Sequence, residues 1–463
     1  MRVLLPILFT ILSITAAVGQ DSTSVFKIAS ISFEGNKITK ESILYREMTL
    51  NVGEQFTLST IGKKLERSRN NIRSLNIFNS VYVDTCVNNK SIDVVIRLME
   101  RWYVIPIPII KYADRNLGEW IAQGWKVDRL DYGLDVWWSN FRGRNETLFI
   151  LAQFGYNNSF GFKYRIPYLD KKKKFGIDLE FYFTRNHEIA YGVEESIRVF
   201  YKDPENFVQV KYSAAAGLII RPKLYNTHFV RLEYTDASIA DTVAQLNPRY
   251  FNPGNSSTRY FSLSYKVKRD KRDYNVYPLT GYHFEMELRK EGLRVFNNGV
   301  DMLDISAEFT KFWQLHNRWY LGSGIKFKAS PFNTQAYYTQ RGLGYETDFV
   351  RGYELYVIDG QYYGLAKTNI RFQPIKDRMI NLKFIKNKKV GLIPLSVFTS
   401  FHIDAGYVVD NKFNAGNPLA NRFIVGVGVG VDLVTFYDVA WRLEYSLNDR
   451  FEHGFFIHFT KHI

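Results

Sequence analysis

From about residue 102 to the C-terminus, apolar and polar residues alternate along the chain, as they do in β-strands with one apolar face. A clear case is 283–288, where Phe284, Met286 and Leu288 alternate with His283, Glu285 and Glu287. In a soluble sandwich the apolar face would pack on a second sheet. In a membrane barrel it would face lipid, while the charged residues would face a lumen.

This alternating region, 101–463, is long enough for about 16 antiparallel strands at roughly 22 residues per strand and connection. An even number of strands is usual in bacterial barrels. Closure of the sheet would also pair the backbone N–H and C=O groups, which are costly to leave unpaired in hydrocarbon. We therefore expect a membrane all-β fold, an antiparallel transmembrane β-barrel.

Residues 24–100 have a different pattern and predict a small α+β domain with the element order β-α-α-β-β. Thr39 is a suitable N-cap for the first helix, and Ser59 for the second. Two strands, near 81–87 and 92–98, are joined by a hairpin turn and complete the unit. About 75 residues are enough for one modest core, so we expect an autonomous domain.

The chain opens with Met1 and Arg2, followed by an apolar run that ends at Val18 and by the small residue Gly19. This arrangement is typical of a secretory signal peptide, here 1–19. The apolar run is shorter than the roughly 20 residues that cross a bilayer, so a retained membrane anchor is the weaker alternative. No later apolar stretch is long enough for a transmembrane helix, and we expect an exported chain without one.

Aromatic residues make up 16% of the chain, which is typical of barrels with aromatic girdles at the membrane interfaces. The formal net charge of +15 would suit nucleic acid in the cytoplasm, but an exported protein meets lipid phosphates and acidic polypeptides instead. Lys and Arg are expected mainly in a wet lumen and in loops. The single Cys86 excludes an intramolecular disulfide and a Cys-based zinc site, and we expect it to be a small core residue.

A lone arginine, Arg351, lies in the Gly-rich segment 340–364 between two alternating stretches. About fifty residues further on, Asp404 lies in the middle of a strand, where a carboxylate is costly unless it faces water or a cation. We therefore expect Arg351 and Asp404 to pair and to pin a loop inside the barrel. The glycines at positions 426, 428 and 430 lie within a strand pattern and would leave room for such a loop or permit curvature.

Two parts of the chain resemble a known family. The segment from Phe33 to Thr39, with Gly35 and Asn36 at its centre, and the β-α-α-β-β order resemble a POTRA domain, the periplasmic polypeptide-transport module. Joined to a barrel that holds Val350–Tyr353 and Phe401–Gly406, the chain resembles the outer-membrane insertase and translocase superfamily typified by BamA, TamA and the two-partner secretion transporters, the bacterial surface antigen family. The resemblance covers essentially the whole mature chain.

The resemblance implies a location and a function. The POTRA domain would lie in the periplasm and receive client polypeptides, while the barrel would insert or translocate them at the bacterial outer membrane through a weak seam between its first and last strands. Lipid and accessory proteins are the other partners that it implies. The residues that it assigns to an inward loop lock are Arg351, Gly352, Tyr353, Asp404 and Gly406.

The chain departs from the family pattern in three places. The strand after the arginine loop usually carries a glutamate, whereas this chain has Asn369 or Thr368 as a possible second lock partner. A neutral partner would leave Asp404 as the main counter-charge of Arg351. The aromatic Phe401 lies three residues before Asp404 rather than two. The last strand carries the C-terminal recognition signal of outer-membrane barrels at Gly454, Ile457 and Phe459, but the chain continues to residue 463.

Enzyme signatures are missing from the sequence: it has no Gly-x-Ser-x-Gly elbow, no His-Glu-x-x-His motif and no phosphate-binding Gly-Lys-Ser/Thr run. We therefore expect no catalysis, no cofactor and no metal site. A passive pore or surface-binding barrel remains an alternative function. A two-partner secretion transporter is less favoured, because those proteins usually carry two POTRA domains.

Overall fold

The computed structural model describes residues 25–112, 130–251, 254–296, 300–331, 336–381, 392–411, 416–435 and 439–460. The expected signal peptide, 1–19, lies outside these residues. None of the helices in the described part of the chain is long and apolar enough to cross a membrane.

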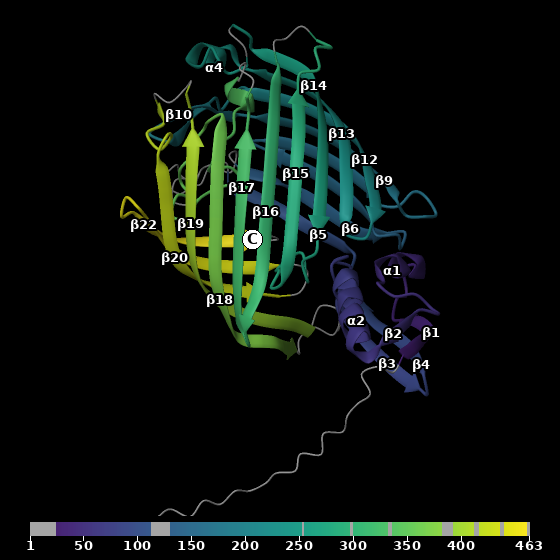
Figure 1. The fold of residues 1–463 in the computed structure, drawn as a ribbon. Coiled ribbons are helices and arrows are strands. Elements are labelled where there is room, and N and C mark those ends of the chain that lie inside the picture. Colours follow the sequence, from purple (N-terminus) through teal and green to yellow (C-terminus); the bar gives the residue numbers. More distant parts are fainter. Residues whose placement is uncertain are drawn as a thin grey trace, which may run out of the picture.

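The N-terminal domain is a four-stranded sheet covered by two helices (Figure 1). Its elements are β1 Val25–Glu34, α1 Glu41–Glu47, β2 Gln55–Thr57, α2 Leu58–Arg73, β3 Phe78–Asn88 and β4 Ser91–Glu100. The strand order is β2-β1-β4-β3, with β1 parallel to β4 and the other pairs antiparallel. Ile28, Leu44, Ile72 and Ile96 are almost completely buried between helices and sheet, so the domain has a core of its own.

Four details differ from the sequence prediction. Ser59 is not the N-cap of α2, because the helix begins one residue earlier, at Leu58, and Thr57 is its N-cap. The short strand β2 lies between the two helices, because three residues pair with the start of β1. Thr39 does not cap α1, since its hydroxyl donates to Glu100 at 2.7 Å. Cys86 is exposed rather than buried, because it lies in the outer half of the edge strand β3, which the helices do not cover.

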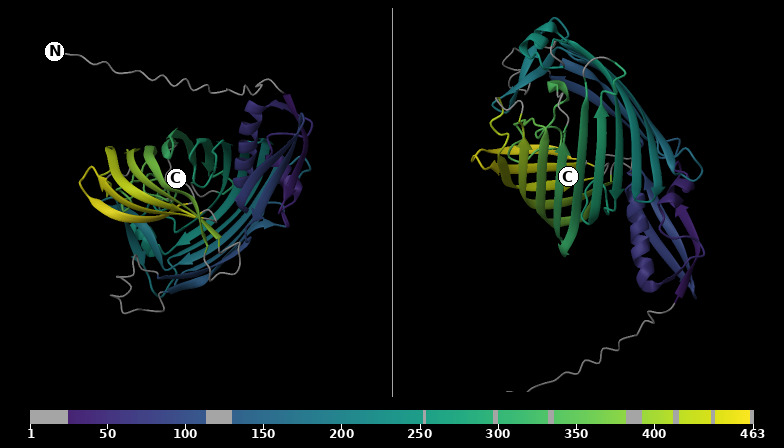
Figure 2. Two further views of the ribbon diagram at one scale, coloured as in Figure 1. Left: turned by 90° about the horizontal axis from the view of Figure 1, so that it is seen from below. Right: turned by 45° about the horizontal axis from the view of Figure 1, so that its top comes forward.

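The rest of the described chain forms a sixteen-stranded antiparallel sheet that curves into a barrel (Figures 1 and 2). Its strands are β5 Val104–Tyr112, β6 Leu130–Phe141, β7 Glu146–Gly155, β8 Asn158–Ile166, β9 Phe175–Asn186, β12 Gln209–Lys223, β13 Asn226–Ile239, β14 Ser257–Asp270, β15 Gly281–Glu291, β16 Met302–His316, β17 Trp319–Ala329, β18 Tyr362–Asn381, β19 Leu392–Val409, β20 Phe423–Val434, β21 Ala440–Asn448 and β22 His453–Thr460. The predicted fold class and strand number are confirmed.

The sheet has two ends. Each strand pairs with its neighbours in order from β5 to β22, and among the strands that the structure describes no pairing joins β5 to β22. The hairpin of β10, Glu188–Glu194, and β11, Ile197–Lys202, and the short helix α4, Asp241–Leu246, lie at the end of the barrel away from the N-terminal domain (Figure 1).

The alternating pattern places apolar side chains outside and charged ones inside. Met286 and Leu288 on β15 are exposed on the outer face, whereas His283 on the same strand is buried. On β21, Trp441 and Leu443 are exposed and the intervening Arg442 is buried. An outward apolar face on every strand fits a barrel wall that contacts lipid.

The N-terminal domain is attached to the barrel turns by its helices. Glu47 at the end of α1 accepts two hydrogen bonds from Arg221 of β12, at 2.6 and 2.9 Å. Tyr168, in the turn before β9, also donates to Glu47 at 3.2 Å, and burial raises the pKa of its phenol so that it stays a donor. The guanidinium of Arg73 on α2 lies over the ring of Tyr274, 4.2 Å from its centroid.

Candidate functional site

The candidate site is the connection between β17 and β18, of which the structure describes 330–331 and 336–361. Its longer part folds back into the barrel lumen. Its apolar residues Leu343, Val350 and Ile358 are almost fully buried against Leu365, Val408 and Ile424 of the wall. Here we call 336–361 the inward loop. A loop with a core of its own against the wall is held by burial as well as by charge.

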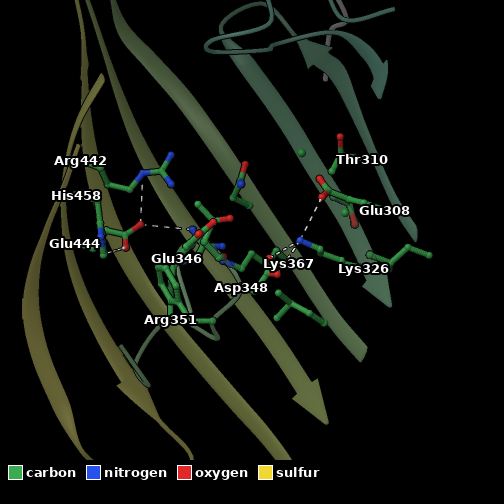
Figure 3. Close-up of a pocket in the computed structure, with 18 of the residues that line it drawn as sticks. Glu308, Thr310, Lys326, Glu346, Asp348, Arg351, Lys367, Arg442, Glu444 and His458 are labelled. Atoms are coloured by element: carbon green, nitrogen blue, oxygen red, sulfur yellow. Dashed lines mark hydrogen bonds and ion pairs between the residues drawn. The ribbon is translucent and has the colours of Figure 1, made fainter. Parts of the chain in front are cut away.

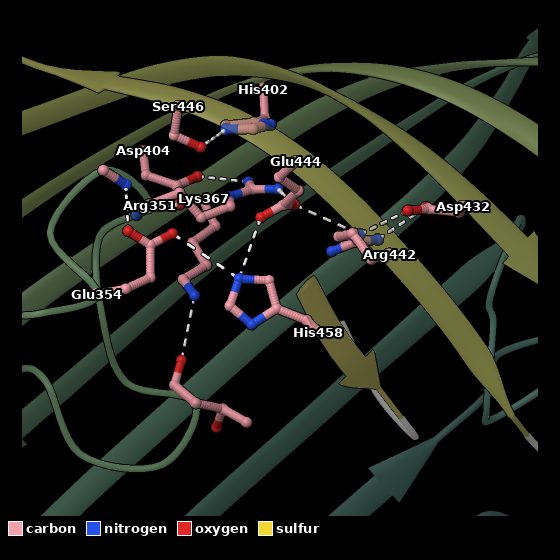
Figure 4. Close-up of polar contacts among 12 residues, drawn as sticks. Arg351, Glu354, Lys367, His402, Asp404, Asp432, Arg442, Glu444, Ser446 and His458 are labelled. Carbon is pink, nitrogen blue, oxygen red and sulfur yellow. Dashed lines mark hydrogen bonds and ion pairs between the residues drawn. The ribbon is translucent and has the colours of Figure 1, made fainter. Parts of the chain in front are cut away.

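Arg351 and Asp404 form a buried, bidentate ion pair between the inward loop and β19 (Figure 4). The guanidinium donates from Nε to Oδ2 at 2.7 Å and from Nη2 to Oδ1 at 2.6 Å. The backbone N–H of Arg351 donates to Oδ2 as well, at 3.2 Å. The Arg351 side chain is 5% exposed and that of Asp404 is 0% exposed, so the pair is shielded from water.

A second carboxylate lies beside this pair, and it is Glu444 rather than a residue of β18. Nη1 of Arg351 lies 3.5 Å from Oε1 of Glu444, and Nε of Arg442 lies 3.4 Å from the same oxygen. Arg442 in turn makes a bidentate pair with Asp432 at 2.6 and 2.9 Å. The charged groups therefore form a chain from the inward loop across β19, β21 and β20.

The prediction that Asn369 is a second lock partner is not supported by the geometry. Asn369 is buried on β18, but its Oδ1 accepts no hydrogen bond. Glu444 was missed because its position opposite Arg351 depends on strand register. Only its alternation with Trp441, Leu443 and Tyr445 could have marked it as facing the lumen.

Glycines make room for the inward loop at two places on the wall. A Cβ at Gly426 would lie 1.7 Å from the carbonyl oxygen of Arg351, and a Cβ at Gly406 would lie 2.7 Å from Cγ2 of Val350. Gly352 has a φ of +92°, a conformation that favours glycine. The predicted lock residues Gly352 and Gly406 thus allow a close backbone approach.

The inward loop also contacts the hairpin between β21 and β22. Tyr353 is 2% exposed, and its hydroxyl donates to the carboxylate of Asp449. The side-chain amide of Asn448 donates to the carbonyl of Gly352 at 3.0 Å. Tyr356 donates to Glu452 at 3.0 Å. The five residues predicted for the lock are therefore all at contacts between the loop and the last four strands.

A cavity of about 400 Å³ lies between the inward loop and the lumen face of the wall (Figure 3). Its lining is strongly polar on the side of β16, β17 and β18, where Glu308, Lys326 and Lys367 point into it. Lys326 pairs with Asp348 of the loop at 2.7 Å. The inward loop and the wall therefore enclose a cavity lined by charged side chains.

The remaining predicted site residues lie at the two ends of the chain. Gly35 has a φ of +92°, and a Cβ there would lie 2.1 Å from the carbonyl oxygen of Leu98, while the Asn36 amide donates to the carbonyl of Thr39 at 3.1 Å. On β22, Ile457 is 63% exposed on the outer face, and a Cβ at Gly454 would lie 2.9 Å from the ring of Phe456.

The backbone of Phe459 pairs with Trp441 of β21. The positions of the expected C-terminal signal, Gly454, Ile457 and Phe459, thus all lie on the last strand of the sheet. Whether they serve as a recognition signal stays a prediction.

Comparison with known families assigns both parts of the chain. The model described as the Omp85 superfamily domain matches residues 140–435. The chain belongs to the Omp85 superfamily. A POTRA model, described as a surface antigen variable number repeat, matches 26–101, so this Omp85 protein has one POTRA domain in the matched region. The resemblance inferred from the sequence is confirmed.

Solved structures share the fold. BamA from Haemophilus ducreyi, lacking POTRA domains 1–3, is 15% identical with a TM-score of 0.51, covering 94% of this chain and 84% of that one. CdiB from Escherichia coli is 10% identical with a TM-score of 0.56, covering 93% and 75%. CdiB from Acinetobacter baumannii is 12% identical with a TM-score of 0.50, covering 94% and 74%. No curated protein sequence matches this Omp85 chain.

Proposed function

We propose that this Omp85 protein lies in the bacterial outer membrane and assembles, inserts or translocates client polypeptides, with its POTRA domain in the periplasm. The observation that carries the proposal is that β5 and β22, at the two ends of the sheet, each pair on one side only among the strands that the structure describes. An unpaired edge in hydrocarbon leaves backbone N–H and C=O groups without partners, at several kcal/mol each. Such an edge needs either its opposite edge or a strand of another polypeptide.

The composition of β5 favours a weak seam. Pro106 and Pro108 occupy two of its nine positions, and proline has no N–H to donate. These two positions cannot donate a backbone hydrogen bond to a neighbouring strand. Pairing of β5 with β22 would therefore be less stable than pairing between two strands without proline. A client strand that pairs with the edge of β22 would then compete effectively with β5.

Site-specific photo-crosslinking tests this step. A photoreactive residue is placed at Phe455 on β22, whose side chain is 85% exposed, and the matched control is placed at Leu218, 41% exposed on β12, away from the seam. We expect client barrels under assembly to crosslink from position 455 and not from 218. Equal crosslinking from both positions, or none from 455, would contradict an active seam.

A reversible disulfide between β5 and β22 gives an independent test of the same seam. Cysteine pairs are scanned across β5 and β22 in a Cys86→Ser background, because the native thiol is exposed and would compete. Client assembly should stop when a disulfide joins the two strands and recover on reduction. Full assembly by the oxidised, crosslinked protein would exclude lateral opening.

The POTRA domain offers a second edge for client capture. Among the described strands, β3 pairs with β4 alone and spans eleven residues, whereas the strand at the opposite edge, β2, has three. Tyr82 and Val87 on β3 are 62% and 52% exposed. An extended client segment that adds to β3 would be bound through its main chain with little sequence preference.

Proline substitution at Asp84 and, separately, at Thr85 tests β3, because adjacent N–H groups point to opposite sides of a strand. In one of the two variants, the lost N–H is the one that points away from β4 toward the free edge. That variant should reduce peptide binding. Proline at Ser91 on the buried strand β4 is a control for general loss of folding. Unchanged peptide binding in both β3 variants would remove this edge from the proposal.

The inward loop supports an assembly role over a passive pore, because it lies across the lumen and is pinned there by Arg351 and Asp404. We infer that the ion pair keeps the wall near the seam in a competent shape. Planar-bilayer recordings discriminate between the two functions: a permanently open pore gives stable, high conductance, whereas an occluded lumen gives low or erratic conductance.

A further inference from the structure

Three side chains with metal-binding atoms meet where the inward loop reaches the last two strands. They are Glu354 of the loop, Glu444 of β21 and His458 of β22, and Figure 4 shows them pointing toward one another. The strand register explains two of them: Glu444 lies opposite Phe456, so His458 is its diagonal neighbour on the lumen face. One ligand atom from each of the three lies within 4.8 Å of the others.

The contacts among these side chains are too long for hydrogen bonds. Nε2 of His458 lies 3.4 Å from Oε2 of Glu444 and 3.8 Å from Oε1 of Glu354, whereas a good N–H···O bond spans about 2.7 to 3.2 Å. Two atoms that share a tetrahedral zinc ion at about 2.0 to 2.2 Å lie roughly 3.3 to 3.6 Å apart. The observed spacing is therefore closer to that of two ligands of one metal ion.

The polar atoms involved are buried without hydrogen-bond partners. The side chain of Glu444 is 0% exposed, and neither of its carboxylate oxygens accepts a hydrogen bond. Oε1 of Glu354 and Nε2 of His458 are buried without one as well. Unsatisfied buried carboxylates and imidazoles are rare in native proteins, and an ion is one of the recognised explanations.

Glu444 shares its two neighbouring guanidinium groups, at 3.5 and 3.4 Å, with carboxylates that lie closer to them. Arg351 is bidentate with Asp404, and Arg442 is bidentate with Asp432, so each guanidinium has a closer carboxylate than Glu444. Lys367 donates to the backbone carbonyl of Thr347. Among the described residues, the ion-pair partner of Glu354 is His458 alone.

We propose that Glu354, Glu444 and His458 form a binding site for a divalent transition-metal ion, with one imidazole and two carboxylates as ligands and water in the fourth position. This donor set suits zinc, whereas magnesium prefers oxygen ligands in octahedral geometry. The ion reaches the site from the lumen cavity, which Glu444 and His458 line. When bound, it ties the free edge strand β22 to the inward loop.

The test uses the full mature chain purified in detergent through a tag without histidine, treated with a chelator and desalted. Zinc is titrated by calorimetry, and bound metal is counted by mass spectrometry. We expect one zinc ion per chain at this site. His458→Ala and Glu354→Gln should each weaken binding at least about tenfold, the loss that even outer-shell changes cause at metal sites.

The matched control is His453→Ala, because His453 lies on the same strand and is exposed on the other face. It should bind zinc as the wild type does. Absence of zinc binding by the chelator-treated wild type overturns the proposal, and so does an equal loss in His453→Ala and His458→Ala. Glu354→Gln keeps the shape of the side chain, so a folded Glu354→Gln protein with wild-type affinity also overturns it.

X-ray absorption at the zinc edge gives a readout that does not depend on variants. We expect mixed nitrogen and oxygen ligands at about 2.0 to 2.2 Å, including an imidazole scattering pattern. A spectrum with water oxygens alone would identify the ion as surface-bound and refute the site.

Discussion

Replacement of Arg351 by alanine is expected to lower the free energy of unfolding by about 3 to 5 kcal/mol, the cost of leaving one member of a buried ion pair alone. The hydrogen bonds that make up the pair lead to a similar magnitude. Two side-chain hydrogen bonds join Arg351 to Asp404, and bonds to charged groups contribute roughly 1.5 to 3 kcal/mol each. Because Asp404 is 0% exposed, little water reaches the carboxylate in the docked state.

The measurement is urea unfolding in lipid vesicles, followed by the fluorescence of the chain's eight tryptophans. Arg341→Ala is the control, because Arg341 is an exposed arginine of the same loop, and it should change the free energy by no more than about 0.5 kcal/mol.

A double-mutant cycle with Asp404→Ala isolates the pair. Removal of both partners should cost less than the sum of the two single changes, with a coupling of about 1 to 3 kcal/mol. A single-variant effect within about 0.5 kcal/mol of the control, together with no coupling, would refute the view that this pair holds the loop.

The other predictions concern close approaches and the domain interface. Gly426→Ala places a methyl group 1.7 Å from the Arg351 carbonyl oxygen and should release the inward loop, which faster proteolysis of the loop would show. Gly192→Ala is the control, because a Cβ there meets nothing within 4 Å, and it should leave the rate of proteolysis unchanged. Gly35→Ala should destabilise the POTRA domain by at least about 1 to 2 kcal/mol, because φ is +92° there; thermal unfolding of the isolated domain measures it. Glu47→Gln should loosen the POTRA domain from the barrel, because it weakens the two hydrogen bonds from Arg221. Faster hydrogen exchange in α1 would report this. Unchanged exchange would show that the other contacts are enough to hold the domain on the barrel.

The sequence by itself determined the architecture of this protein. The two-residue period fixes which side chains face lipid, since successive side chains of a strand point to opposite faces. Helix and strand periods together predicted the small N-terminal α+β domain, apart from the three-residue strand β2, which is too short to show a period. Its likeness to a POTRA domain came from the segment Phe33–Thr39 and the element order. The pairing of Arg351 with Asp404 was also readable, because a mid-strand carboxylate and a lone arginine each require a partner.

Only the tertiary structure decided which groups meet inside the barrel. Glu444, rather than Asn369, lies beside Arg351, and His458 on the last strand meets Glu354 of the inward loop. Such contacts depend on strand register, on the curvature of the wall and on the path of a loop that crosses the lumen. No local pattern carries that information, because residues far apart in sequence come together only when the sheet has curved and the loop has docked.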